Sequence, residues 1–192
     1  MFLSFIIVID YKTNNKRKGD NKMNVNTTGK DFIKKWECNN IAELTVKDDG
    51  FGNLTVGYGH KVVTADKLKA GDKITQAKAD SFFTSDLSTV ETAINKHPKV
   101  GSMTQVMYNA TASLLYNVGT SPVTTTTNDL YKALNSDATY KSPISTAAKN
   151  AVVTAFTYTK VNGKRVEGLV NRRNAELNVF LGTTDKIYIT MN

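Results

Sequence analysis

One stretch of strand-like sequence separates segments with helical periodicity, and this arrangement narrows the folds open to the chain. Between Leu44 and His60 the pattern reads "LTV", a turn and then "LTVGY", which predicts a β-hairpin or small sheet. Ahead of it, Phe32, Ile33 and Trp36 fall on one face of a short helix. A helix and a sheet followed only by helices predict an α+β fold, with a small N-terminal lobe and a larger helical C-terminal lobe.

The segments after the sheet carry the apolar spacing of amphipathic helices. Thr75 is a good N-cap for "TQAKADSFFTSDLSTVETAINKH", which Pro98 closes, and Thr104 opens the nearly uncharged "TQVMYNATASLLYNVG", a central helix. We expect a short helix in "DLYKALN", a helix in "SPISTAAKNAVVTAFTY" with Pro143 in its first turn, and a last helix in "GLVNRRNAELNVFLG". The threonine-rich "GTSPVTTTTND" is predicted to be a loop, and "KVNGKR" a turn.

Residues 1–22 are predicted to be an extension outside the fold, ahead of one domain over residues 23–192. The apolar run of the extension, Phe2 to Ile9, is far shorter than the roughly 20 residues that span a bilayer, and its positive charges follow the run. It fits neither a signal peptide nor a membrane anchor, so we expect no stable membrane insertion. Met23 then precedes a natural domain start, and the first helix is expected after its cap-type residues, Thr27, Thr28 and Asp31.

Composition excludes several classes of protein. At 192 residues, with 40% hydrophobic and 22% charged residues, the chain can bury one full core. Its one cysteine, Cys38, excludes an internal disulfide, and with only two histidines an ordinary zinc site cannot form, so we expect no metal and no other cofactor. The net charge of +8 predicts attraction to a polyanion, which includes nucleic acid, an anionic membrane surface and a wall with acidic polymers.

Two kinds of carboxyl group stand close in the sequence. Glu37 ends the first helix beside Trp36, where the edge of an apolar face removes solvation and favours the protonated form that a general acid needs. Asp48 and Asp49 lie in a glycine-rich turn, where water keeps carboxylates ionised. Such a pair is typical of enzymes that cleave glycosidic bonds. By spacing alone, the two aspartates could equally be turn-forming residues. Glu37 would then be a surface charge, and Thr55 an ordinary strand residue.

The two stretches "FIKKWE" and "DDGFGNLTVGYGH" resemble the catalytic signature of the phage lysozymes, or endolysins, of glycoside hydrolase family 24. That signature is a helix ending in Glu, then a hairpin reading Asp, two residues, Gly, two residues, Thr, an aliphatic residue and Gly-Tyr-Gly-His. The segments "ITQAKADSFFTSDL", "TQVMYNATASLLYNVGTS" and "GLVNRRNAELNVFL" are also similar to the family, in the same order. The resemblance covers about residues 27 to 182.

The resemblance implies a lysozyme-like fold with an active-site cleft between the lobes. It implies Glu37 as the general acid, Asp49 as the carboxylate that assists the attacking water, and Thr55 as the hydroxyl that positions this water. Such a division suits an inverting mechanism, with the two carboxyl groups about 6.5 to 9.5 Å apart. Gly52 would allow a tight turn. Gly57 and Gly59 would allow the hairpin backbone to approach the sugar or the first helix closely.

The chain departs from the family pattern near the acid. Cys38 stands where the family usually has Gly, the segment from Glu37 to Asp49 is longer than usual, and Lys47 stands where a tyrosine is expected. Counting back from Thr55 favours Asp49 as the catalytic aspartate. An altered turn would give the role to Asp48 instead, so both remain candidates.

The other titratable and polar residues have simpler interpretations. His60 is expected to be a hydrogen-bonded structural histidine and His97 a surface residue. Cys38 is expected to be a small, semi-buried residue. Solvated ion pairs are expected for Arg172 and Arg173, one of them near the cleft. For Tyr116 and Asn117 two interpretations remain open, either packing in the core or lining the floor of the cleft.

These observations favour a muramidase that hydrolyses the β-1,4 bond between N-acetylmuramic acid and N-acetylglucosamine in peptidoglycan and so lyses the host cell. The alternative is a wall-binding module of the same fold with little catalysis. A nucleic-acid partner is not expected, because no basic helix is interleaved with stacking aromatics. We expect a monomer that accumulates in the host cytoplasm and reaches the wall with a membrane-permeabilising partner, as endolysins do as a group.

Overall fold

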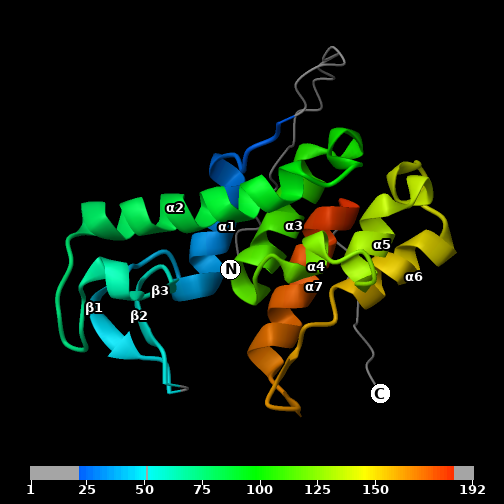
Figure 1. Cartoon of the computed structure of the whole chain (residues 1–192). Coiled ribbons are helices and arrows are strands. Elements are labelled where there is room, and N and C mark those ends of the chain that lie inside the picture. Colours follow the sequence, from blue (N-terminus) through cyan, green and yellow to red (C-terminus); the bar gives the residue numbers. More distant parts are fainter. Residues whose placement is uncertain (1–21, 51, 184–192) are drawn as a thin grey trace, which may run out of the picture.

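The computed structural model describes residues 22–50 and 52–183, which form a small sheet lobe and a larger helical lobe (Figure 1). The helices are α1 (Thr27–Cys38), α2 (Gln76–Asn95), α3 (Gln105–Val118), α4 (Ser121–Thr124), α5 (Asp129–Asn135), α6 (Thr146–Ala155) and α7 (Glu167–Leu181). The strands are β1 (Glu43–Asp48), β2 (Leu54–Gly57), β3 (His60–Lys61), β4 (Lys160–Val161) and β5 (Lys164–Arg165). This is the predicted α+β architecture.

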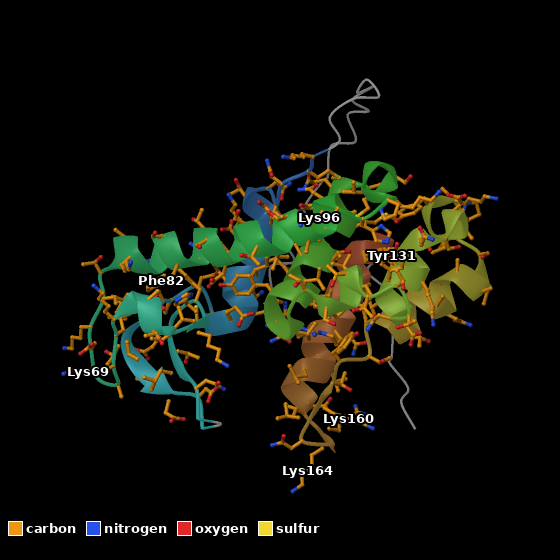
Figure 2. All side chains as sticks on the ribbon, in the orientation of Figure 1. Lys69, Phe82, Lys96, Tyr131, Lys160 and Lys164 are labelled. Atoms are coloured by element: carbon orange, nitrogen blue, oxygen red, sulfur yellow. The ribbon has the colours of Figure 1, made fainter. Side chains whose placement is uncertain are left out.

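The sheet of the small lobe is antiparallel, in the order β1-β2-β3. Thr55 in β2 lies opposite Lys47 of β1 and Lys61 of β3. Because side chains alternate between faces along a strand, the neighbouring Val46 and Val56 point to the other face. Both valines are buried, and they cluster with Phe82 of α2, which Figure 2 labels between the helix and the sheet. One face of the sheet is therefore covered by α2, and the face that carries Thr55 is not packed in this cluster.

Helix α2 connects the two lobes. It follows its predicted N-cap, Thr75, whose side chain accepts a hydrogen bond from the backbone of Lys78. Its N-terminal half contacts the sheet, and its C-terminal half contacts α3 and α4 (Figure 1). The predicted stripe on α2 is buried throughout, and it consists of Phe83, Leu87, Val90 and Ile94. A single helix thus contributes to the packing of both lobes.

Helix α3 is the centre of the helical lobe, as its lack of charge predicts. It packs against α1, α2 and α7, and its residues from Tyr108 to Leu115 are all buried. Of the apolar residues predicted to face inward from α7, Leu177 and Phe180 are fully buried and Leu169 is half-buried. The apolar faces of these helices form the main core.

Four local predictions differ from the structure. Helix α1 begins earlier than expected, because Asn26 is its N-cap and accepts a hydrogen bond from Gly29 N–H at 3.0 Å. Pro143 precedes α6 instead of lying in its first turn, since Ser145 is the N-cap. The threonine-rich segment contains the short helix α4, which has a proline in its first turn. The turn in "KVNGKR" is the tip of a two-stranded hairpin, β4–β5.

The described chain begins just before the core. The backbone N–H of Met23 donates to Asn95 Oδ1 at 2.9 Å, and Val25 is buried. The predicted extension, apart from Lys22, lies outside the described residues, as do residues 184–192 of the predicted domain. Within residues 22–50 and 52–183, none of the helices has both the length and the apolar character that crossing a membrane requires.

Candidate active site

Glu37 lies in the last turn of α1 with its side chain 15% exposed. Its Oε1 is 2.7 Å from Nη1 of Arg172, a residue of α7. The helix ends one residue later, at Cys38, because Asn39 adopts the left-handed conformation and its N–H bonds back to the carbonyl groups of the last turn. The predicted acid is therefore held in a nearly buried position next to a cation.

The arginine beside Glu37 belongs to a buried network of charges. Arg172 Nε lies 3.0 Å from Glu176 Oε1, and Arg172 Nη2 donates to the Ser113 carbonyl at 3.2 Å. Arg173 lies on the other side of the same carboxylate, with its Nε 2.8 Å from Glu176 Oε2. Ser113 Oγ donates to Glu176 Oε1 at 2.7 Å. Glu176 thus binds both arginines and a hydroxyl at once.

Burial of this network corrects the prediction of solvated ion pairs. Arg172 is 4% exposed, and Arg173 and Glu176 are 0% exposed. Burial lowers the pKa of Arg173 to about 10, which still leaves the guanidinium charged at neutral pH. The expectation that one arginine pairs with an acidic residue is met by Arg172 and Glu37. Neither Glu176 nor Ser113 was predicted, although the spacing of Arg172, Arg173 and Glu176 places all three within one turn of a helix.

The turn between β2 and β3 brings the hairpin backbone against the acid. Gly59 has φ +86°, and a Cβ atom at this position would lie 3.2 Å from Glu37 Oε2. The preceding carbonyl, of Tyr58, accepts a hydrogen bond from the Tyr116 hydroxyl at 3.1 Å, which ties this turn to α3. The predicted close approach of Gly59 to the first helix is confirmed. Gly57 instead allows close approach to α2, where its Cβ would be 3.3 Å from that of Ala79.

Asp48 and Asp49 both hydrogen bond within the turn that follows β1. Asp48 Oδ1 accepts from Gly50 N–H at 2.7 Å. Asp49 Oδ1 and Oδ2 accept from the backbone N–H and the side-chain amide of Asn53, at 3.1 and 2.8 Å. Gly52 in the same turn has φ +84°, which is the positive-φ position predicted for it. Both aspartates are exposed to solvent and shape the turn.

Strand alternation separates the two aspartates. Asp48 lies opposite Leu54, whose side chain packs against the cluster under α2, so Asp48 belongs to the covered face of the sheet. The backbone N–H of Asp49 bonds to the Asn53 carbonyl at 2.9 Å, which continues the pairing by one residue. Asp49 is therefore expected on the same face as Thr55, which is half-buried in the middle strand.

The remaining candidates have structural surroundings. His60 Nδ1 lies 2.9 Å from Asp86 Oδ2, and its ring stacks on Phe82, so the prediction of a hydrogen-bonded structural histidine is confirmed. His97 is 3% exposed and lies edge-on to Tyr131, so its prediction as a surface residue is wrong. The cause is the segment after α2, which turns under α5; burial there lowers the pKa of His97.

Three further residues near the acid can also be placed. Cys38 is partly buried, as predicted, and its Sγ lies 3.6 Å from the Lys34 carbonyl. Tyr116 is half-buried with its ring 5.4 Å from that of Phe83, which is core packing. Asn117 is exposed, and its Oδ1 accepts from Arg173 Nη2 at 3.0 Å.

Two surface hollows lie away from these residues. Two hollows, of about 370 and 660 Å³, follow α2 and share Ser88 and Thr89 in their walls, and no predicted catalytic residue lines either of them. Both walls are open and rich in hydroxyl groups, and they lack the buried polar groups that fix a ligand. Among the described residues, no three His, Cys, Asp or Glu side chains are grouped so that they could hold a metal ion.

The two-lobed α+β fold, with a nearly buried glutamate on the first helix and a glycine-rich hairpin packed against it, defines a lysozyme-like glycoside hydrolase. The chain belongs to the phage lysozyme family, whose family model, "Phage lysozyme", matches residues 34–176. It is a muramidase, and its substrate is the peptidoglycan of the host cell wall.

Individual relatives agree with this assignment. The chain is 33% identical to an "Endolysin" of Acyrthosiphon pisum secondary endosymbiont phage 1, over 82% of this chain and 98% of that protein. It is 32% identical to a "SAR-endolysin" of Enterobacteria phage P21, over 69% of this chain and 72% of that protein. Among solved structures, the endolysin of Escherichia coli O157:H7 phage FAHEc1 is similar with a TM-score of 0.64 and 28% identity, over 86% of this chain and 96% of that one.

Proposed function

We propose that Glu37 is the general acid of this muramidase, that Asp49 assists the attacking water and that Thr55 positions this water. The observation that carries the proposal is the placement of the Glu37 carboxyl group. One oxygen lies 2.7 Å from Arg172, and the other faces the hairpin backbone at Gly59. A carboxyl group fixed between two elements of different lobes is held in one orientation, as a proton donor to a bound sugar must be.

Arg172 has a specific role in this scheme. When Glu37 gives its proton to the leaving sugar oxygen, the carboxylate that forms lies next to the guanidinium group, which stabilises the new negative charge. Glu176 shares that guanidinium through its own contact at 3.0 Å. The network therefore holds Arg172 in place while part of its charge is already balanced.

Strand alternation supports Asp49 over Asp48 as the second carboxylate. Asp49 and Thr55 are expected on the same face of the hairpin, whereas Asp48 belongs to the face that α2 covers. A carboxylate and a hydroxyl on one face can share a water molecule. Asp49 is then the base of an inverting reaction, in which one water attacks from the side opposite the leaving group.

Loss of turbidity of a cell-wall suspension tests these roles. We expect Glu37→Gln to lower the rate by at least about a hundredfold, since it removes the proton donor and keeps the shape of the side chain. Glu167→Gln is the matched control, because its carboxylate is on α7 and 71% exposed. A Glu37→Gln protein that still clears the suspension contradicts the proposal, whereas one that binds walls without clearing them agrees with it. If wild-type protein itself binds walls without cleaving them, the chain is a wall-binding module.

The two aspartates make a second matched pair. Asp49→Asn should abolish activity. Asp48→Asn should keep activity and weaken only the turn hydrogen bond that Asp48 accepts from Gly50. If only Asp48→Asn is inactive, the two assignments are exchanged. The anomeric form of the first product, followed by NMR, reports whether the reaction inverts.

We also propose that the protein is a monomer without a nucleic-acid partner. We further propose that residues 1–22 lie outside the catalytic fold and that the protein accumulates in the host cytoplasm before a permeabilising partner gives it access to the wall. The sequence of the apolar run supports the last point, because that run is far shorter than a bilayer span. Fractionation of infected cells before lysis checks it, and recovery of the protein in the periplasmic fraction contradicts it.

A further inference from the structure

Two lysines flank the proposed catalytic hydroxyl on the sheet. Thr55 of β2 lies directly opposite Lys47 of β1 on one side and Lys61 of β3 on the other. Residues directly opposite each other in an antiparallel pair have their Cβ atoms about 4.5–5.5 Å apart and point to the same face. The three side chains therefore form one cross-strand row, with an ammonium group on each side of the threonine.

This row lies on the face of the sheet that faces away from α2. The neighbouring positions Val46, Val56 and His60 belong to the other face, where the valines are buried and the histidine stacks on Phe82. Lys47 and Lys61 are both exposed, whereas Thr55 is half-buried between them. A ligand that contacts Thr55 therefore has an exposed lysine on each side.

The two lysines differ in their carboxylate neighbours. Lys47 forms an ion pair with Glu43 on its own strand, and its hydrogen bond lowers the pKa of that carboxyl group. Asp49, two residues after Lys47 and just past the end of β1, is expected on the same face. For Lys61, no carboxylate lies within ion-pair distance anywhere in the described ranges, 22–50 and 52–183. The charge of Lys61 is therefore available to a ligand, and that of Lys47 is largely balanced.

We infer that Lys61, assisted by Lys47, binds a carboxylate carried by the N-acetylmuramic acid residue of the bound glycan. The inference rests on the proposed role of Thr55, which places the sugar at this row. In peptidoglycan only the muramic acid residue bears a lactyl group, whose carboxyl is either free or joined to a peptide stem with carboxylates of its own. N-acetylglucosamine carries no such group. A cation beside the cleavage site thus recognises the sugar whose glycosidic bond is cleaved.

Steady-state kinetics on purified walls test this binding. We expect Lys61→Gln to raise KM about three- to fivefold with kcat within about twofold of wild type, as an exposed ion pair allows. Lys47→Gln should raise KM less, because Glu43 already balances that charge. Lys69→Gln is the matched control, since Figure 2 shows Lys69 at the outer edge of the sheet lobe and Lys69 is not one of the paired positions that form the row. At about 0.5 M salt, the difference between Lys61→Gln and wild type should disappear.

Two substrates distinguish the sources of the carboxylate. If Lys61→Gln also raises KM on glycan strands stripped of peptide, the ligand is the lactyl carboxylate; if it does so only on intact walls, the ligand is on the stem. Oligomers of N-acetylglucosamine, used as competing ligands, should bind wild type and Lys61→Gln equally well.

An unchanged KM for Lys61→Gln, or one that changes equally in Lys69→Gln, overturns the inference while Glu37→Gln remains inactive. Weaker binding of N-acetylglucosamine oligomers to Lys61→Gln also overturns it, because these oligomers carry no carboxylate. If Glu37→Gln is active, the proposed function itself fails, whatever Lys61 does.

Discussion

Gly59 contributes to the site through its missing side chain. Its φ of +86° is a conformation that L-residues with a Cβ atom rarely adopt, and the space in front of it is occupied by Glu37 Oε2 at 3.2 Å. Gly71 has almost the same backbone, with φ +87°, but no atom lies within 4 Å of its Cβ position. Both positions thus require a positive φ, but only at Gly59 would a side chain also collide with a neighbouring atom.

We expect Gly59→Ala and Gly71→Ala to lower the free energy of unfolding by similar amounts, about 1–2 kcal/mol each, because both strain the backbone. Only Gly59→Ala should also lower kcat/KM, by about tenfold or more, since the added methyl group displaces the acid. Urea denaturation and wall-clearing rates measure the two effects. Equal activity losses in both variants would show that the contact with Glu37 has no catalytic consequence.

The environment of a single residue can be predicted from the sequence where the neighbouring residues in the chain determine it. The glycines of the turn and the partly buried Cys38 follow from chain geometry and size. The burial of His97 and of the two arginines does not, because it depends on α5 and α3, which are distant in sequence. Glu176 was missed for the same reason, since its partners include Ser113 on another helix.

At the scale of elements, α7 is docked onto α3 and next to α1 through one buried carboxylate. Glu176 accepts hydrogen bonds from Ser113 of α3 and from Arg172, which in turn reaches Glu37 of α1. Arg173 pairs with the same Glu176 carboxylate and is completely buried. Removing the charge of Glu176 leaves two buried guanidinium groups without their shared acid.

We therefore expect Glu176→Gln to lower the free energy of unfolding by about 3–5 kcal/mol, the usual cost of breaking a buried ion pair on one side. Glu167→Gln, at the exposed start of the same helix, should change it by less than about 0.5 kcal/mol. Chemical denaturation of both variants measures the difference. A loss below about 1 kcal/mol for Glu176→Gln would mean that the network adds little to the docking of α7.

The elements themselves could be predicted well from apolar periodicity. The helices α2, α3, α5 and α7 lie where their patterns predict them. The start of α6 was misplaced because proline is acceptable in a first turn, but Ser145 provides the actual cap. The start of α1 was misplaced because Asn26 caps it while also accepting from Asn109 of α3, a tertiary contact.

At the scale of the whole molecule, an ion pair joins α1 to the helix that connects the lobes. Lys34 Nζ is 2.8 Å from Asp80 Oδ1, and it also lies 4.1 Å from the centre of the Tyr58 ring in the hairpin. Gln76 Nε2 donates to the Tyr58 hydroxyl at 3.0 Å and to Asp80. Three segments, α1, α2 and the turn between β2 and β3, are thus linked by one group of side chains.

The Lys34–Asp80 pair makes the stability of this linkage depend on pH. The hydrogen bonds from Lys34 and Gln76 lower the pKa of Asp80 in the folded protein. A carboxyl group with a lowered folded pKa stabilises the fold above its unfolded pKa, near 3.9, and loses this contribution as the pH falls through the folded value. Asp80→Asn should therefore cost about 0.2–1 kcal/mol near neutral pH, as a half-exposed pair does, and progressively less as the pH falls through the folded pKa of Asp80. Urea denaturation of Asp80→Asn, Lys34→Gln and the double variant across this range measures the coupling. A coupling that grows at acid pH would contradict the assignment, because protonation of Asp80 can only remove the attraction.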